Sequence, residues 1–418
     1  MSKGTLRVLD LFCGPGGFST GFEAAGFEVV GAYDKDKWAV TTYSANHNIA
    51  AQSIDLAKFD MADMPDVDLI LGGPPCTQFS SAKSNKTRNV LDGLLLVQAF
   101  LRCVYIKKPK YWIMENVPTI QKYLPPSIPL RYIGIDEDGY LNIPQKAELI
   151  AADYGVPQRR KRYLIGNFPL PTQTHRKSGS EDLLLDRDLP NWVPMKHVLK
   201  AFPSPLAEIS KRKVEDPNYG FSIASEDLTD QFYDASLSKS EARSIEQAKT
   251  NHPYMGVLAW PDKIDEPART VVATQLGRET LIIGPDSCRA DVFRRATVRE
   301  CASLQSFPIS YQFFGSTYGI KYRLVGDAVP PLMAFAIAKG IAEIEGHSDV
   351  KQQFKSEFLQ KANQLADRLE PRKKRVNPKR KVNLKKKKEN KQVNPVNYHL
   401  IVVLYFLYHF VDFLIRHK

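Results

Sequence analysis

The first 115 residues alternate short apolar runs with amphipathic segments. Short apolar runs are typical of buried strands, and apolar residues that recur every three to four positions are typical of helices. The predicted strands are "LRVLDLF" (6–12), "EVVGAYD" (28–34), "VDLILGG" (67–73) and "YWIMENV" (111–117). The predicted helices are "FSTGFEAAGF" (18–27), closed by a glycine, and "VLDGLLLVQAFLRCVYIK" (90–107). This alternation predicts an α/β fold with a parallel sheet covered by helices on both faces.

The pattern changes after residue 170. Residues 171–265 are polar, rich in Ser, Pro and Asp, and show no sustained period, which predicts a smaller second domain or an elaborated loop region. Within or beside it, "RTVVATQ" (269–275) and "ETLIIG" (279–284) resemble strands. Helical patterning returns at 294–308 and in "PPLMAFAIAKGIAEIEG" (330–346), which reads as an amphipathic helix initiated by proline.

The C-terminal residues differ in composition from the rest of the chain. Residues 371–397 are rich in Lys, Asn and Pro and are predicted to be disordered. From 368 to 391 there are 13 Lys or Arg and two acidic residues, which accounts for nearly all of the net charge of +12 and leaves the folded body close to neutral. The apolar end (398–418) contains His409 and Asp412 and is short for a membrane span. We therefore expect an extension unrelated to the core function rather than membrane contact.

Cysteine usage and the start of the chain indicate a cytoplasmic protein. The five cysteines are scattered, none forms a C-x-x-C pair, and no histidine cluster has zinc-ligand spacing. This pattern favours a reducing compartment without a disulfide framework, and it predicts no metal site. The opening "MSKGTLRVLDLF" passes from a short polar stretch straight into an apolar run, unlike a signal peptide.

A glycine-rich turn follows the first predicted strand. In "DLFCGPGGFSTGF" (10–22), Gly14, Gly16 and Gly17 lie between a strand and a helix, where a ligand can approach bare backbone. Asp34 ends the next strand, the position from which such folds contact a ribose hydroxyl. These residues fit a nucleotide-like cofactor or a merely structural tight turn. The spacing departs from the G-x-G-x-x-G pattern of dinucleotide sites.

A second group of residues is predicted at the same sheet edge. The strand ending in "LGG" delivers Pro74 and Pro75, which restrict the backbone just before Cys76. A restricted backbone fixes the direction of the Cys76 side chain, which a nucleophilic thiolate requires and a buried structural thiol does not. Glu115 ends another strand and is a candidate acid. The basic run "QRRKR" (158–162) follows, placed to direct one arginine inward and others toward phosphates.

The ordered series "DLFCGPGGFSTGF", "GGPPCTQFS", "MENV", "AADYGVPQRRKRYLIG", "TVRECASLQSFP" and "GDAVPP" resembles the motifs of the DNA (cytosine-5) methyltransferases. The likeness runs from residue 10 to about 345. It implies a Rossmann-like, S-adenosylmethionine-dependent methyltransferase sheet with a smaller, irregular target-recognition domain. The implied domains are catalytic and cofactor-binding (1–170), target recognition and hinge (171–319), a C-terminal helix returning to the catalytic domain (320–347), and a helical extension, basic linker and apolar tail (348–418).

The resemblance implies a role for each candidate residue. Cys76 would attack carbon 6 of a flipped-out cytosine, and Glu115 would hydrogen-bond ring nitrogen 3 and the exocyclic amine. Arg162 would hold the base oxygen, and Asn116 would brace the loop. The residues implied to hold S-adenosylmethionine are Phe12, Gly14, Gly16, Gly17, Asp34 at the ribose, Asp55 at the adenine, Pro75 and Asp327.

Two positions depart from the family pattern. The residue after the nucleophile is Thr77, followed by Gln78, where glutamine more often comes first. Asp327 occupies a position commonly held by asparagine, which adds a carboxylate near the cofactor. The contact made by the loop and the strength of cofactor binding are therefore open.

The implied substrate is a specific sequence in double-stranded DNA, methylated within a bacterial restriction–modification system. A cognate endonuclease acting on the same site is a potential partner, and we expect a monomer. Three alternatives stay open: a tRNA-methylating member of the same family, a catalytically silent DNA-binding relative, and a nucleotide-dependent oxidoreductase. The missing dinucleotide spacing disfavours the last.

Overall fold

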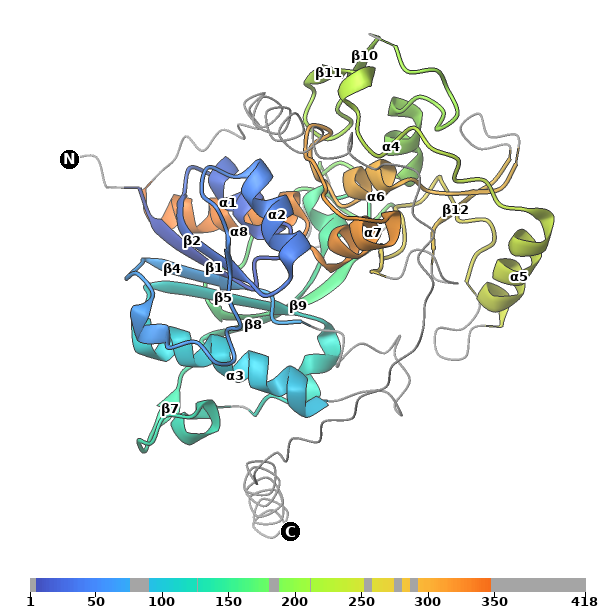
Figure 1. Cartoon of the computed structure of the whole chain (residues 1–418). Helices are drawn as coiled ribbons and strands as arrows, with labels where there is room; N and C mark the ends of the chain where they lie inside the picture. The colour runs from blue at the N-terminus through green and yellow to red at the C-terminus, as the bar shows by residue number, and fades with distance from the viewer. Residues whose placement is uncertain are drawn as a thin grey trace, which may run out of the picture. The chain divides into compact units, whose positions relative to one another are not determined.

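The computed structural model describes residues 5–75, 90–125, 127–179, 188–210, 212–251, 258–273, 280–285 and 292–346. Its centre is a seven-stranded sheet of order β3-β2-β1-β4-β5-β9-β8 (Figure 1). The strands are β1 (Arg7–Leu11), β2 (Glu28–Asp34), β3 (Gln52–Ser53), β4 (Leu69–Gly72), β5 (Tyr111–Asn116), β8 (Gln145–Ile150) and β9 (Lys161–Asn167). The four strands predicted in the first 115 residues are all confirmed.

The sheet is mostly, but not wholly, parallel. Strands β3, β2, β1, β4 and β5 run parallel, whereas β9 is antiparallel to both β5 and β8. The parallel arrangement predicted from the first 115 residues is confirmed for β1, β2, β4 and β5, and the antiparallel β9 lies beyond those residues. Residues 151–160, which join β8 to β9, are too few for the crossover that a parallel pair requires, so the chain turns back on itself.

Helices cover both faces of the sheet, as the apolar pattern predicted. Helices α1 (Gly17–Ala24) and α8 (Pro331–Ile344) lie on one face, and α3 (Val90–Lys107) lies on the other (Figure 1). Successive residues of β1 point to opposite faces, so that Val8 joins the core under α1 and α8 while Leu9 joins the core under α3. Helix α2 (Lys37–Asn46) follows β2 and is capped by Asp36, whose carboxylate accepts two backbone N–H groups.

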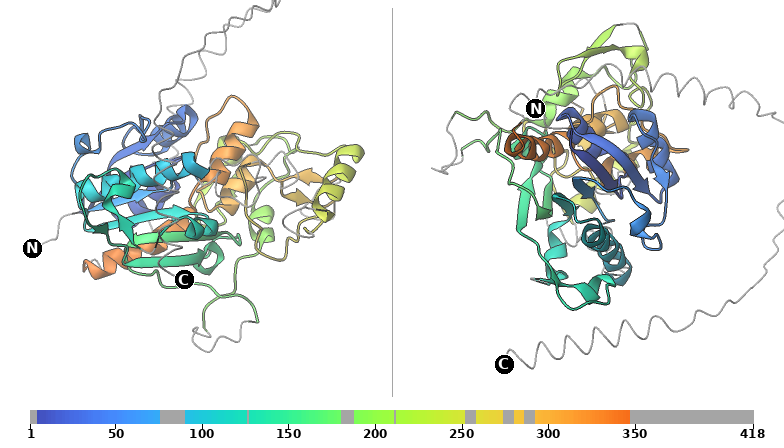
Figure 2. Two further views of the ribbon diagram at one scale, coloured as in Figure 1. Left: turned by 90° about the horizontal axis from the view of Figure 1, so that it is seen from below. Right: turned by 90° about the vertical axis from the view of Figure 1, so that its left-hand side faces the viewer.

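A smaller lobe with its own apolar core lies beside the sheet (Figure 2, left). Its elements are α4 (Met195–Ala201), β10 (Lys213–Glu215), β11 (Ser222–Ala224), α5 (Lys239–Thr250), β12 (Ile282–Ile283), β13 (Arg294–Arg295), α6 (Val298–Leu304) and α7 (Tyr318–Asp327). Shorter elements elsewhere are β6 (Ile128–Pro129), β7 (Tyr140–Leu141), η1 (Met61–Asp63), η3 (Pro118–Lys122), η4 (Leu130–Ile133), η5 (Ala151–Tyr154) and, within the lobe, η6 (Ser225–Asp227).

Residues 269–273 are not a strand, contrary to the pattern of "RTVVATQ". This stretch is hydrogen-bonded instead to the segment between β8 and β9. The Val271 N–H donates to the Gln158 side chain, and the carbonyl of the preceding Ala268 accepts from the Arg159 N–H. Tertiary contacts have overridden local strand propensity here. The second predicted strand, 279–284, is confirmed in part as β12.

The segment predicted to return to the body (320–347) contains most of α7 and all of α8, separated at residues 328–330. Together, Tyr318–Ile344 is long and apolar enough to cross a membrane by length and composition, but 67% of its most apolar window is buried inside the fold. These helices are core elements: α7 packs in the lobe and α8 against α1.

Helix α1 approaches the α7–α8 junction so closely that its first residue must be glycine. A Cβ added to Gly17 would lie 2.0 Å from the backbone oxygen of Val329. We expect Gly17→Ala to lower the free energy of unfolding by about 2–3 kcal/mol, because backbone cannot move aside cheaply. Gly340→Ala in α8 is the matched control, since its new methyl group meets Pro169 at an ordinary 3.5 Å.

Urea denaturation of both variants checks this expectation. Gly340→Ala should be neutral or stabilising by up to about 1 kcal/mol, because alanine favours a helix over glycine. Equal stability of the two variants would contradict the proposed packing.

Candidate active site

The glycine-rich turn joins β1 to α1 at the carboxyl edge of the sheet. Its backbone is left-handed at Phe12 (φ 56°), Gly14 (φ 55°) and Gly16 (φ 102°). Space above the turn is open: no heavy atom lies within 4 Å of a Cβ built on Gly14, beyond its own neighbours. At Gly14 the turn therefore leaves room for a ligand to approach the backbone, whereas Gly16 and Gly17 are buried.

Two carboxylates lie at the ends of the neighbouring strands β2 and β3. Asp34, at the end of β2, accepts hydrogen bonds from the Gly14 N–H (2.9 Å) and the Asp36 N–H (2.8 Å). Burial raises the pKa of Asp34 above its ordinary value, and these N–H groups offset part of that rise. Asp55 is more exposed and pairs with Lys35 at 2.8 Å, a hydrogen bond that lowers its pKa.

Asp327 adds a third carboxylate at the end of α7. The Asp327 side chain is 39% exposed. Its surroundings nevertheless raise its pKa above the ordinary value: partial loss of hydration is the main cause, Arg323 works against that rise, and the charge of Asp34 adds to it. Arg323 contacts Asp36 at 2.7 Å and Asp327 at 3.9 Å. This arginine is hydrogen-bonded to Asp36 and offsets part of the charge of the additional carboxylate.

The set of donors and acceptors suits a cationic adenosyl ligand. Asp34 and Asp55 can accept ribose and adenine donors, and a sulfonium is favoured beside carboxylates. A pyrophosphate would be repelled by the same groups. The described residues at the turn therefore fit S-adenosylmethionine better than a dinucleotide.

The strand ends β4 and β5 meet beside this turn. Asn116 is fully buried, and its Nδ2 donates to the Pro74 carbonyl at 3.0 Å while its Oδ1 accepts from the Val117 N–H at 2.9 Å. Pro75 is exposed and leads toward Cys76. The predicted nucleophile and its neighbours Thr77 and Gln78 lie outside the described residues.

Glu115 and Arg162 form a buried ion pair between β5 and β9. Arg162 Nε lies 2.5 Å from Glu115 Oε1, and each side chain is 8% exposed. The two groups are not aligned for a hydrogen bond, so that both atoms lack a hydrogen-bond partner among the described residues. A Cβ added to Gly73 would lie 3.5 Å from Glu115 Oε2, which places the carboxylate beside the residues that lead to Cys76.

The basic run 158–162 alternates between buried and exposed side chains. Gln158, Arg160 and Arg162 are buried, whereas Arg159 and Lys161 are exposed. We predicted that one arginine of this run would be buried, and the structure buries two, Arg160 and Arg162. This alternation is the period of an extended strand, so the same spacing could have identified Arg160 from the sequence.

Comparisons with known proteins agree on one family. The family of C-5 cytosine-specific DNA methylases matches residues 6–343. The chain belongs to this family. It is similar to two type II methyltransferases, M.FnuDI of Fusobacterium nucleatum (29% identical, covering 85% of this chain and 99% of that one) and M.MthTI of Methanothermobacter thermautotrophicus (30%, 82% and 98%). A DNA modification methyltransferase from an Escherichia coli prophage has the same fold (TM-score 0.56, 21% identity, covering 82% of this chain and 100% of that one).

This membership places the chain among the S-adenosylmethionine-dependent DNA (cytosine-5) methyltransferases. The predicted family, fold class and enzyme class are confirmed, and the oxidoreductase alternative is wrong. The individual roles of the site residues and the domain boundaries stay predictions.

Arg160 connects three parts of this methyltransferase. Its guanidinium donates to the backbone carbonyls of Val271 (3.0 Å), Gly326 (2.9 Å) and Ala328 (3.0 Å). Through these bonds the strand that carries Arg162 is tied to the lobe segment 268–273 and to the α7–α8 junction.

Arg160→Met should lower the free energy of unfolding by about 3 kcal/mol, because buried carbonyls lose a charged donor. Arg159→Met is the matched control: Arg159 is 46% exposed and pairs with Glu266 on the surface, and its loss should cost less than about 1 kcal/mol. Chemical denaturation of both variants measures the difference. A cost for Arg160→Met no larger than that of its neighbour would show that these bonds do not hold the fold together.

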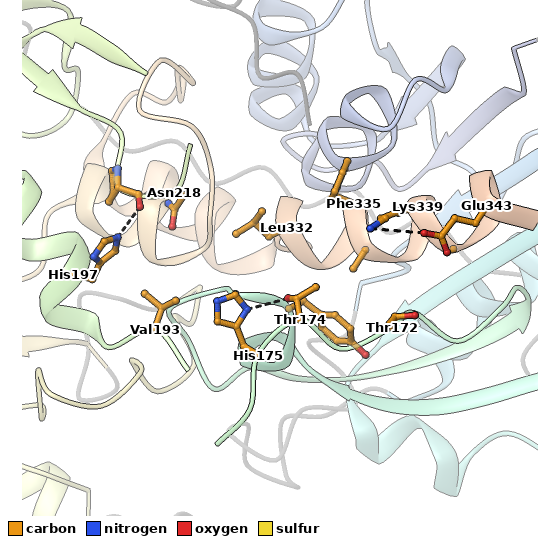
Figure 3. A pocket seen from close by; sticks show the side chains of 15 residues that line it. Thr172, Thr174, His175, Val193, His197, Asn218, Leu332, Phe335, Lys339 and Glu343 are labelled. Atoms are coloured by element: carbon orange, nitrogen blue, oxygen red, sulfur yellow. Dashed lines mark hydrogen bonds and ion pairs between the residues drawn. The ribbon is translucent and has the colours of Figure 1, made fainter. Parts of the chain in front are cut away.

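A cavity of about 390 Å³ lies between α8, η5 and the lobe (Figure 3). His175, His197 and Lys339 contribute its polar lining, and Leu332 and Phe335 contribute apolar surface. The predicted catalytic and cofactor-binding residues that the structure describes are all absent from this lining. The cavity is therefore distinct from the candidate active site.

Proposed function

We propose that this protein transfers a methyl group from S-adenosylmethionine to carbon 5 of cytosine in a specific sequence of double-stranded DNA. The observation that carries the proposal is the buried Glu115–Arg162 pair, placed beside the strand that leads to Cys76 in a member of the cytosine-5 DNA methylase family. A flipped cytosine offers a donor amine to the carboxylate and an acceptor oxygen to the guanidinium.

The cofactor is proposed to lie over the glycine-rich turn. Phe12, Gly14, Gly16, Gly17 and Pro75 would line it. Asp34 would bind the ribose hydroxyls and Asp55 the adenine, and Asp327 would lie near the cationic centre. S-adenosylmethionine supplies an electrophilic methyl group when it is bound. The acidic surroundings described above support this assignment.

The protein's own residues make carbon 5 reactive. A Cys76 thiolate would form a bond to carbon 6 of the cytosine, which pushes electrons toward carbon 5. Glu115 would hydrogen-bond ring nitrogen 3 and the exocyclic amine and supply the proton that nitrogen 3 takes up. After methylation, a water molecule would take up the carbon-5 proton, the electrons of that bond would expel the Cys76 thiolate, and nitrogen 3 would return its proton to Glu115, which restores the ring and the enzyme.

Two residues would hold the reacting groups in place. Arg162 would bind the oxygen of the base while its contact with Glu115 orients that carboxylate. Asn116, by its bond to the Pro74 carbonyl, would set the angle at which Cys76 leaves the strand. Accurate placement of this kind accounts for much of the rate of an enzyme.

The substrate is proposed to be DNA with the target base flipped out of the helix. Residues 171–319, which include most of the lobe, would supply the base-reading contacts, and local positive charge such as Arg159 and Lys161 would contact phosphates. The similarity to type II methyltransferases supports a restriction–modification role with a cognate endonuclease as partner. A cytoplasmic monomer that requires no metal is the form we propose.

Methyl transfer from labelled S-adenosylmethionine to unmethylated genomic DNA and to bulk tRNA, measured in parallel, tests the proposal. We expect label at carbon 5 of cytosine in one short DNA sequence, found by base-resolution mapping. Label in tRNA alone would move the protein to RNA methylation. Cofactor binding without label in either substrate would indicate a catalytically silent DNA-binding protein.

A further inference from the structure

The underside of the glycine-rich turn is held by a residue 296 positions away in the sequence. Tyr311 lies between α6 and α7, and its hydroxyl donates to the Pro15 carbonyl in the middle of the turn. The Tyr311 side chain is 1% exposed and packs in the core of the lobe with Phe307 and Phe313. The turn is therefore hydrogen-bonded to the lobe as well as connected to β1 and α1.

His47 supports the same phenol from the other side. Its Nε2 lies 2.9 Å from the Tyr311 hydroxyl, and its Nδ1 lies 2.7 Å from Glu23 Oε2. The imidazole stacks on Tyr43, with ring centroids 4.0 Å apart. His47 is buried at the end of α2, so both ring nitrogens and one ring face have defined contacts.

These two side chains press directly against the backbone of the turn. A Cβ added to Gly16 would lie 2.2 Å from His47 Nε2 and 2.7 Å from the Tyr311 hydroxyl. The turn also contains Phe12 with a φ of 56°, a conformation that costs free energy for a residue with a side chain. Such a conformation persists only where surrounding contacts hold it.

We propose that Tyr311 is a positioning residue for cofactor binding: it keeps Pro15 and Gly16 in the conformation that receives S-adenosylmethionine, and His47 orients its hydroxyl. The inference rests on the proposed function, because it concerns the same cofactor site. Tyr311 acts through the backbone of the turn and contacts neither of the proposed reacting groups, Glu115 and Arg162, in the described structure. Its loss should therefore weaken cofactor binding more than it slows the chemical step.

Tyr311→Phe tests this, because it removes one hydroxyl and keeps the ring in the core. Tyr322→Phe is the matched control: Tyr322 is 2% exposed, and its hydroxyl bonds to the Ala296 carbonyl (2.6 Å) and to Tyr233 (2.7 Å), both within the lobe. Both substitutions delete a buried phenol hydroxyl, but only the first concerns the turn.

Isothermal titration with S-adenosylmethionine and with S-adenosylhomocysteine gives Kd, and steady-state assays give KM and kcat. For Tyr311→Phe we expect Kd and KM for the cofactor to rise about 3- to 10-fold, the value of one hydrogen bond, with kcat at saturation changed less than about twofold. Tyr322→Phe should lower the melting temperature and leave Kd unchanged.

Three results would overturn the inference. The first is a Kd for Tyr311→Phe equal to that of the wild type. The second is a loss of affinity in both variants that follows the fall in their melting temperatures. A wild-type protein that binds neither compound would overturn the proposed function and this inference together. If Tyr311→Phe does not fold, His47→Gln replaces it as the test, with a rise in Kd expected and an unchanged Kd contradicting the proposal.

Discussion

Cys76→Ser is expected to reduce methyl transfer by about 10⁴-fold or more while DNA and cofactor binding persist. A serine hydroxyl at neutral pH is a far weaker nucleophile than a thiolate, and without attack on carbon 6 the ring stays too electron-poor at carbon 5. Transfer of label to DNA that contains the mapped site measures the rate, and gel-shift titration measures DNA binding.

The described cysteines are poor substitutes for Cys76. Burial raises the pKa of Cys103 to about 12 and that of Cys13 well above its ordinary value, so neither is a thiolate at neutral pH. Cys103→Ser is therefore the matched control. It should lower stability, because Cys103 is fully buried on the core-facing side of α3, and it should retain kcat. Undiminished turnover in Cys76→Ser would remove this residue from the mechanism.

Glu115→Gln should lower kcat by about 10²- to 10⁴-fold, the usual contribution of a general acid. The amide keeps the volume of the side chain and can still contact the base, but it cannot deliver a proton to ring nitrogen 3. It also leaves the buried charge of Arg162 without its carboxylate, so some loss of stability is expected as well. The KM for the cofactor should hardly change, since Glu115 lies on the base side of the site.

Glu148→Gln controls for the loss of a carboxylate from the same sheet. Glu148 lies on β8 and pairs with Lys161 at 3.0 Å on the surface, so this variant should keep wild-type kcat. Single-turnover methylation of a short duplex separates the chemical step from product release. A kcat for Glu115→Gln within tenfold of the wild type would show that another group protonates the base.

The two site predictions differ in how much the structure contributes. Cys76 is identified by its local setting, a strand followed by glycines and prolines, and the described residues end just before it. Glu115 is identified as a candidate acid by its place at the end of a strand. Its pairing with Arg162, which lies 47 residues further along the chain, is a tertiary contact that no local pattern predicts.

Local pattern by itself determined the strands β1, β2, β4 and β5, helix α3 with its bounds 90–107, and the proline start of α8. It also placed the glycine-rich turn and the ends of β4 and β5 at one edge of the sheet. These features depend on residues close together in the sequence. The period of the apolar residues predicts the element, glycine ends a helix, and the fixed φ of proline favours the start of one.

Only the tertiary structure decided which polar groups meet. The antiparallel β9, the loop at 269–273, the carbonyl partners of Arg160 and the bond from Tyr311 to Pro15 all depend on residues that lie far away in the sequence. A buried polar group must find a hydrogen-bond partner wherever the fold brings one. That partner is chosen by how the lobe packs on the sheet, and single-sequence periodicity carries no record of that packing.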